Sequence, residues 1–366
     1  MVRVVARRQH PAPHFSALRM SDPSTPRRMV KAWLKGEPPS RPLLMPILFS
    51  LGARIENLTL ENFQRNPTKI SNALRQIRSV IEVDGLTCYF DPVLEMDALG
   101  LRREWQADGS WATSAPVIAE VDELRQKLNS PDSLENKGLI PVACDVLRRV
   151  KAIIKDEPAL MIRVSGPITV ARQLCGEPVG STSQFPQDLV QFSSEVTASV
   201  ARTFAAAGAD VILLAEDLEA GLPGANFEWY SSLLAPVVNV VRFYEALPVL
   251  LLGKISQEML HAVRAHVEDC VLCPTLTAAQ VALSLEPHPR LSMAYALPIQ
   301  AYQEQREAEA LLTSEVAAKL SLLTSSQDVP AGCDPKKLAE GLKGLRGHFT
   351  CRPDVSRGLP HPGGPD

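Results

Sequence analysis

Several polar side chains follow directly after short apolar runs of this sequence, and they are the residues best placed for chemistry. Asp91 directly follows the run DGLTCYF (84–90) and precedes Pro92, which stops strand pairing. A carboxylate at the end of a buried strand could accept a proton, hold a cation or orient hydrogen-bond donors. Equally, Asp91 could cap the next helix, with Pro92 in its first turn.

Other polar residues occupy the same kind of position. Arg54 and Lys254 could hold an anionic group, although a surface lysine that extends into solvent is the plainer interpretation of Lys254. Glu216 and Asp217 could position a polar group, and a solvated acidic loop would look the same. The remaining members of this set are Ser50, Ser165, Thr169, Tyr295 and Cys333.

Cys270 and Cys273 form a C-x-x-C pair, a spacing that also occurs in metal and redox sites. They lie in an apolar run of strand length, where residues three apart point to opposite faces, and no second pair completes a site. We therefore expect two buried thiols. His261 and His266 lie on a helical stretch, and we expect them to be solvated or capped rather than catalytic.

The elements that must position these residues are short apolar runs that alternate with longer amphipathic stretches, a pattern typical of βα units. Eight runs lack strict polar alternation, as expected of strands covered on both faces. The predicted strands are Leu43 to Phe49, Gly85 to Phe90, Ala159 to Val164, Asp210 to Leu214, Pro248 to Leu252, Asp269 to Cys273, Arg290 to Ala294 and Asp328 to Ala331. Helices are predicted between them, for example at 67–83, 185–208 and 301–323.

Eight such units predict an α/β fold consisting of a single (β/α)8 TIM barrel, with surplus chain between Gly100 and Ala159. A doubly wound sheet is the alternative, but neither of the glycine-rich nucleotide motifs is present. TPRRMVKAWLKGEPP predicts an N-terminal helical extension that starts near Ser24 or Thr25. In a barrel, the polar residues that follow the strands meet at the carboxyl face, where active sites lie.

We expect one barrel domain at 24–347, flanked by flexible tails at 1–23 and 348–366. The first tail is basic and lacks the apolar core of a secretory signal. Three interpretations fit it: a disordered segment, residues that precede a true start at Met20, or an organelle-targeting sequence.

The composition excludes several classes of protein. Of 366 residues, 45% are hydrophobic, and 38 Lys and Arg balance 41 Asp and Glu, so there is no overall charge suited to nucleic acid or an anionic membrane. The longest apolar runs are far shorter than a membrane helix requires. Seven dispersed cysteines indicate reduced thiols. We expect a cytoplasmic protein that acts on a small molecule.

Four segments resemble the uroporphyrinogen decarboxylase superfamily: VDGLTCYFDPVLEMDALG (83–100), VSGPITVARQL (164–174), GADVILLAEDLEAG (208–221) and LPVLLLGK (247–254). In the first, Asp84, Asp91 and the Ala-Leu-Gly at 98–100 match the spacing around the family's essential aspartate. The resemblance covers nearly the whole chain and implies a TIM barrel. This superfamily contains decarboxylases and zinc-dependent, corrinoid-linked methyltransferases.

The decarboxylase branch implies a run of arginines after the first strand that grips substrate carboxylates, and here only Arg54, in SLGAR, could do this. The family's tyrosine in the G-P-x-T segment falls at Gln173, a candidate substrate contact. The histidine expected near the end of the barrel has no clear counterpart, since His348 lies past the last predicted helix.

The methyltransferase branch implies a zinc ion held by His-x-Cys after the fifth strand and by a distant cysteine. Cys333, in AGCD, matches the last ligand, whereas Leu252 and Lys254 stand where the first two are expected. A single thiolate cannot hold zinc well, so the resemblance implies zinc only in part.

These observations favour a divergent enzyme of this superfamily, a methyl or one-carbon transferase that acts at the barrel mouth with Asp91 as the key polar group. Decarboxylation of uroporphyrinogen or a related tetrapyrrole is one alternative, and a catalytically inactive barrel that binds or regulates is the other. The resemblance also implies a corrinoid protein as partner and a homodimer.

Overall fold

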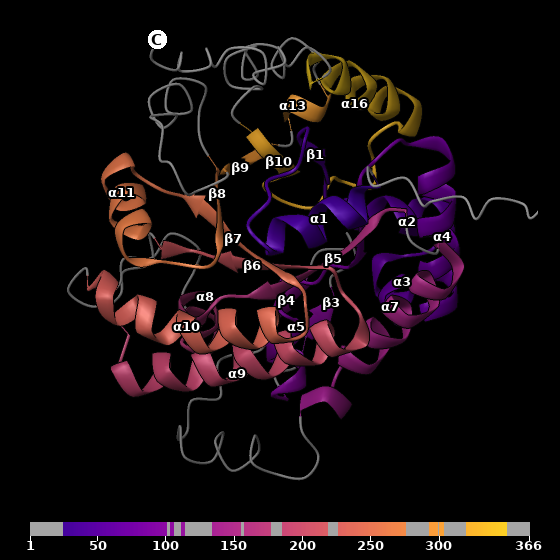
Figure 1. Cartoon of the computed structure of the whole chain (residues 1–366). Coiled ribbons are helices and arrows are strands. Elements are labelled where there is room, and N and C mark those ends of the chain that lie inside the picture. Colours follow the sequence, from indigo (N-terminus) through magenta and orange to yellow (C-terminus); the bar gives the residue numbers. More distant parts are fainter. Residues whose placement is uncertain are drawn as a thin grey trace, which may run out of the picture.

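A parallel eight-stranded sheet forms the centre of the fold (Figure 1). The computed structural model describes residues 25–100, 103–105, 111–113, 134–154, 157–176, 185–218, 226–275, 293–298, 300–303 and 320–349. The strands run in the order β1-β10-β9-β8-β7-β6-β5-β2. Their bounds are β1 Leu43–Leu44, β2 Gly85–Tyr89, β5 Ala159–Ser165, β6 Val211–Glu216, β7 Leu247–Lys254, β8 Val271–Thr275, β9 Met293–Leu297 and β10 Leu320–Ser325.

The sheet is a nearly closed barrel, and its two end strands meet where β1 ends and β2 begins. The backbone N–H of Asp84, just before β2, donates to the carbonyl of Leu44 in β1 at 2.8 Å, and the Leu44 N–H donates to the Asp84 carboxylate at 2.8 Å. Arg41 holds that carboxylate from the other side at 2.7 and 2.8 Å. The predicted (β/α)8 barrel is confirmed.

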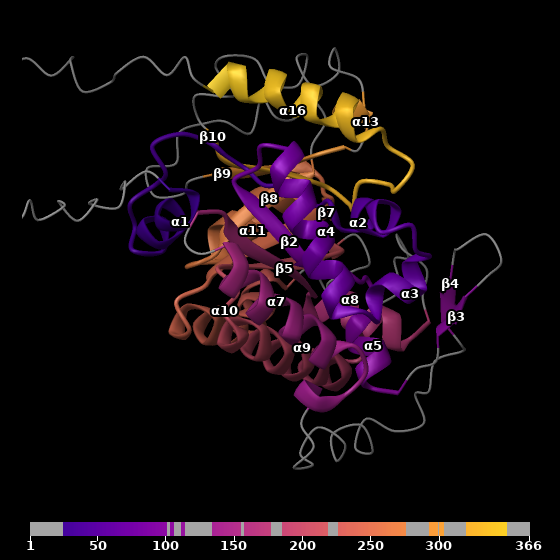
Figure 2. The same ribbon diagram turned by 90° about the vertical axis from the view of Figure 1, so that its right-hand side faces the viewer.

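Helices surround the strands (Figures 1 and 2). Several begin at a side chain that accepts the N–H of the third helical residue, as Asn66 does for Lys69 and Ser256 for Met259. The α-helices are α1 Pro26–Leu34, α2 Phe49–Ile55, α3 Leu60–Gln64, α4 Pro67–Val80, α5 Leu94–Ala98, α7 Ile140–Ile154, α8 Pro167–Leu174, α9 Gln187–Ala207, α10 Phe227–Phe243, α11 Gln257–His266, α13 Gln300–Gln303 and α16 Pro335–Phe349. None in the described ranges is long and apolar enough to cross a membrane.

The surplus chain after Gly100 contains a small antiparallel hairpin, β3 Arg103–Trp105 and β4 Trp111–Thr113, and a 3-10 turn at Leu134–Asn136. Figure 2 shows the hairpin at the outer edge of the fold. It leaves the eight-stranded sheet intact.

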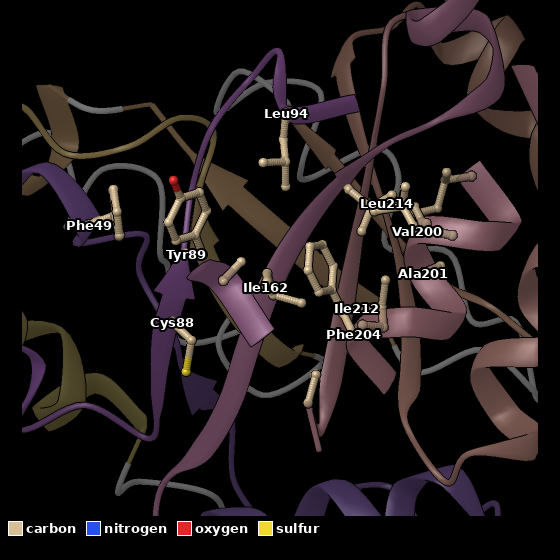
Figure 3. Packing of buried hydrophobic residues seen from close by; sticks show 14 of the residues in the cluster. Phe49, Cys88, Tyr89, Leu94, Ile162, Val200, Ala201, Phe204, Ile212 and Leu214 are labelled. Carbon is tan, nitrogen blue, oxygen red and sulfur yellow. The ribbon is translucent and has the colours of Figure 1, made fainter. Parts of the chain in front are cut away.

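Alternate residues of each strand pack into two separate apolar clusters. Outward residues such as Ile162 and Ile212 pack against Phe204 of α9 (Figure 3). Inward residues such as Met161 and Leu213 fill the barrel interior. Because successive strand side chains point to opposite faces, this division tells which polar residues face the interior.

Helix α1 closes the amino end of the barrel with Met29, Val30 and Trp33, which belong to the interior cluster. Arg27 fixes α1 there, since its Nε donates to both oxygens of Asp210 at 2.9 and 2.8 Å, just before β6. The predicted N-terminal helix is confirmed, with Thr25 at its N-cap.

The predicted eighth strand is wrong. The strand is LSLLTS at 320–325, and residues 328–331 lie in the loop that follows it. The last four residues of the predicted helix at 301–323 therefore belong to β10, while 304–319 lie outside the described residues. A short apolar run after an amphipathic stretch has no periodicity of its own, so it reads as the end of the helix. The helices predicted at 67–83 and 185–208 are confirmed as α4 and α9.

Candidate active site

Asp91 lies two residues beyond the end of β2, at the carboxyl face of the barrel, and its residue surface is only 1% exposed. Its Oδ1 accepts the backbone N–H of Val93 at 3.1 Å. This bond forms a tight turn through Pro92 that leads into α5. The side chain is thus held by the turn at the point where the barrel opens.

The turn is held by side chains from two other elements. Arg163 of β5 donates from Nη1 to the carbonyl of Asp91 at 3.3 Å, and Gln173 of α8 donates from Nε2 to the carbonyl of Pro92 at 2.8 Å. The predicted site residue Gln173 therefore lies beside the turn that carries Asp91. Its Oε1 is buried and has no hydrogen-bond partner among the described residues.

Arg163, Ser165 and Glu95 form a buried chain of hydrogen bonds next to Asp91. Arg163 donates to the Ser165 hydroxyl at 3.1 Å, and that hydroxyl donates to Oε2 of Glu95 at 2.8 Å. The Ser165 N–H donates to Oε1 of Glu95 at 2.7 Å. A cation, a hydroxyl and two carboxyl groups thus gather at the ends of β2 and β5.

Burial dominates the charge states of this group. It lowers the pKa of Arg163, and the charges of Glu95 and Asp91 oppose that shift. Burial also raises the pKa of Glu95, against the influence of Arg163 and of the Ser165 hydrogen bonds. The guanidinium of Arg163 lies over the ring of Phe90, 5.6 Å from its centroid.

Glu216 is the last residue of β6 and is buried against α8 and α10. Its Oε1 accepts the N–H and the hydroxyl of Thr169 at 2.7 and 3.0 Å, and its Oε2 accepts the Tyr230 hydroxyl at 3.2 Å. Burial raises its pKa to about 7, partly offset by these bonds. Asp217 lies 3.5 Å from Nε of Arg172 in α8. Both carboxylates anchor α8 to the end of β6.

Arg54 and Cys333 lie together, on α2 and on the loop before α16. Nη1 of Arg54 donates to the carbonyls of Ala331, Gly332 and Cys333 at 3.2, 3.0 and 2.8 Å. Arg54 thus holds the Cys333 loop. Beside it, Asp328 accepts the N–H groups of Phe49 and Ser50, at 2.8 and 2.9 Å, and the Ser50 hydroxyl.

Two further predicted site residues end up in other positions. Tyr295 lies inside β9 rather than after a strand, and it packs with the outer apolar cluster while Ala294 and Ala296 face the interior. The sequence places that strand three residues too early, which explains the error. Lys254 is the last residue of β7, opposite Thr275 of β8, and its side chain lies outside the described residues.

The described residues do not fit the zinc site of the methyltransferase branch. Leu252 at the end of β7 belongs to the outer apolar cluster, and Cys333 is held in the loop that Arg54 binds. Within the described ranges no three His, Cys, Asp or Glu side chains lie close enough to share a metal ion.

Cys270 and Cys273 are buried thiols, as predicted, and they face opposite sides: the first packs with the outer cluster and the second with the interior. Burial raises the pKa of Cys270 to about 12. His261 and His266 are exposed on α11, and His348 lies in the last turn of α16, with its side chain outside the described residues.

Sequence reasoning missed Arg163 and Glu95, which complete the cluster around Asp91. The signal for Arg163 is present: a charged residue interrupts the apolar strand ALMIRVS, and only an inward position near the barrel mouth could accommodate it. Glu95 stands in a helix-forming run, where an acidic side chain gives no sign of burial.

Comparisons with known proteins place this architecture in a family. The model of the uroporphyrinogen decarboxylase (URO-D) family matches residues 25–271. Among solved structures, a methyltransferase from Methanosarcina mazei superposes with a TM-score of 0.67 at 14% identity, over 88% of this chain and 98% of that one. A dihydrodipicolinate synthase from Agrobacterium tumefaciens has a TM-score of 0.41 at 14% identity, over 84% and 76%. No curated protein sequence matches significantly.

Proposed function

The chain belongs to the uroporphyrinogen decarboxylase family, and from this premise we propose that it is a divergent enzyme that transfers a methyl or one-carbon group of a small molecule. The reaction takes place at the carboxyl face of the barrel, within a single domain at 24–347. The observation that carries the proposal is the position of Asp91, buried where β2 ends and beside Arg163.

In this proposal Asp91 handles the proton of the methyl acceptor. A corrinoid donor would supply the methyl group; an acceptor thiol would lose its S–H proton as the new S–C bond formed, and the cobalt would keep the electron pair of the Co–C bond. The thiol proton then needs a base. A carboxylate within hydrogen-bond reach of the acceptor can receive it, and the turn through Pro92 presets the Asp91 orientation.

The charges at the barrel mouth favour a small substrate over a tetrapyrrole with many carboxylates. Arg54 is engaged with three backbone carbonyls, and Arg172 lies beside Asp217. Among the described arginines, this leaves Arg163 inside the barrel. The described residues therefore leave too few cations to neutralise a polycarboxylate.

The structural neighbour from Methanosarcina mazei, named a methyltransferase, supports this choice within the family, since this chain covers 98% of its length. We extend the proposal to a corrinoid protein as methyl donor and to a homodimer. Decarboxylation of uroporphyrinogen remains the second candidate, because Asp91 keeps the spacing of the family's essential aspartate.

The test combines purified protein with methylcobalamin as donor probe and with 2-mercaptoethanol or 3-mercaptopropionate as acceptor, without oxygen. The S-methyl product is measured by mass spectrometry. We expect Asp91→Asn and Asp91→Ala to lower the rate by about 100-fold or more. Glu245→Gln, an exposed acid at the amino face, is the matched control and should leave the rate unchanged.

A protein that forms no S-methyl product but consumes uroporphyrinogen would establish the second candidate. Inactivity with both substrates would favour a binding or regulatory barrel. Methyl transfer at full rate by Asp91→Ala would disprove the assigned role of Asp91.

A further inference from the structure

Arg163 projects into the barrel interior. Because side chains alternate along β5, Arg163 points to the same face as Ala159 and Met161, which belong to the interior cluster. Its register partner in β6 is the interior residue Leu213. Only 9% of its residue surface is exposed. Arginine is rarely buried to this degree without a charged or hydrogen-bonding partner for its whole guanidinium group.

The guanidinium uses only one of its three nitrogens within the described part of the chain. Nη1 donates to the Asp91 carbonyl and to the Ser165 hydroxyl. Nε and Nη2 have no hydrogen-bond acceptor among the described residues. These two nitrogens form one edge of the planar group, and their parallel N–H bonds match the two oxygens of a carboxylate.

The nearby carboxyl groups are committed to other donors. Both oxygens of Glu95 accept from Ser165, and Oδ1 of Asp91 accepts from Val93. No carboxylate of the described residues forms an ion pair with Arg163, although Glu95 and Asp91 influence it through space. The protein therefore positions this cation through neutral acceptors and leaves an edge for an acceptor from outside the chain.

The surroundings of this edge define the rest of the ligand. Phe90 covers one face of the guanidinium. Ala215, in register with Ser165, and Leu251, in register with Ala215, present short apolar side chains to the interior. Deeper in the barrel, the buried hydroxyl of Thr87 lacks a hydrogen-bond partner within the described residues.

We propose that the carboxyl end of the barrel binds a small carboxylate-bearing molecule, with its carboxylate on the Nε and Nη2 edge of Arg163 and a short apolar stem against Phe90. The inference deepens the proposed function by naming the substrate class, and it rests on that function only for the statement that this ligand is the methyl acceptor.

The test measures binding, so that it does not depend on turnover. Propionate, 3-mercaptopropionate and the uncharged propionamide are titrated into the full-length protein by calorimetry. We expect the two carboxylates to bind and propionamide not to bind. Arg163→Lys, which keeps the charge but loses the fork, should weaken carboxylate binding by about tenfold, and Arg163→Met should abolish it.

Arg149→Lys, the same change on the exposed face of α7, is the matched control and should bind like the wild type. Thermal unfolding provides a second measurement: propionate should raise the Tm of the wild type and of Arg149→Lys, and leave that of Arg163→Lys nearly unchanged. If Arg163→Met does not fold, Arg163→Lys still decides the matter.

The proposal is overturned if neither carboxylate binds the wild type, if propionamide binds equally well, or if both Arg163 variants bind as the wild type does. Binding that depends on Arg163 in a protein without methyl transfer would refute the proposed function alone. Methyl transfer to 3-mercaptopropionate that Arg163→Met leaves unchanged would refute only the statement that the carboxylate ligand is the methyl acceptor.

Discussion

Ser165 donates both its backbone N–H and its hydroxyl to the carboxyl group of Glu95, at 2.7 and 2.8 Å. Glu95 is completely buried, and these two bonds fasten α5 to the end of β5. Because Ser165 also accepts a hydrogen bond from Arg163, the same serine connects the segment after Asp91 with the cation inside the barrel.

Removal of the Glu95 carboxyl group should destabilise the protein strongly. Glu95→Ala leaves the Ser165 N–H and hydroxyl without their acceptor and opens a cavity, which together cost about 2–4 kcal/mol of unfolding free energy. Ser165→Ala removes only the hydroxyl and should cost about 1 kcal/mol. Urea unfolding of both variants and of the double variant should show a coupling energy of about 1 kcal/mol. Strict additivity would contradict the link between the two residues.

The strands and the position of Asp91 could be predicted from the sequence because buried parallel strands appear as unbroken apolar runs. GLTCYF and ALMIRV are such runs, although Arg163 interrupts the second, and a polar residue at the barrel mouth follows each of them, Asp91 the first and Ser165 the second. The strand at 320–325 is not predicted, because the helical pattern of the preceding residues continues into LSLL and hides the start of the strand.

The roles of the site residues depend on whether they lie inside a strand, where alternation fixes the face of each side chain, or beyond its end. The sequence ends the fourth predicted strand at Leu214, whereas β6 ends at Glu216, so Glu216 is an outward strand residue that meets α8. The partners of Arg54 are backbone carbonyls that lie 277 to 279 residues further along the sequence, so no local sequence pattern predicts them.

Glu216 should make stability depend on pH between about 4.5 and 7. Burial raises its pKa from 4.5 to about 7 in the folded protein, so the folded state holds this proton more tightly than the unfolded chain does. The stabilisation is present below pH 4.5 and is lost as the pH rises through 7. Relative to Glu216→Gln, the wild type should lose up to about 3 kcal/mol between pH 4 and pH 8.

Urea unfolding of both proteins at several pH values checks this expectation. Asp328, whose pKa burial also raises to about 7, is present in both proteins, so its effect cancels in the difference. A difference between the two proteins that stays constant from pH 4 to pH 8 would show that Glu216 does not titrate in this way.

Arg54 should control access to the Cys333 thiol. Since its guanidinium binds the carbonyls of residues 331–333, Arg54→Ala should release this loop and speed modification of Cys333 by N-ethylmaleimide by about tenfold, at a cost of about 1 kcal/mol in stability. Peptide mapping by mass spectrometry follows the reaction, with the fully buried Cys273 as internal control. If Arg54 serves to bind substrate instead, the variant should raise KM and leave the Cys333 reactivity unchanged.

The ion pair at the amino end of the barrel should matter for stability and not for activity. Arg27→Met leaves the buried Asp210 carboxylate without its cation and should lower the unfolding free energy by about 3–5 kcal/mol. Asp210→Asn should cost less, because the amide oxygen can still accept the Leu160 N–H that Asp210 binds at 2.8 Å. Urea unfolding measures both changes.

The folded fraction of each variant should keep its carboxylate affinity, since this face lies opposite the proposed site. A weakened affinity in a fully folded Arg27→Met protein would mean that α1 reaches the site through the interior cluster that it shares with β5 and β6.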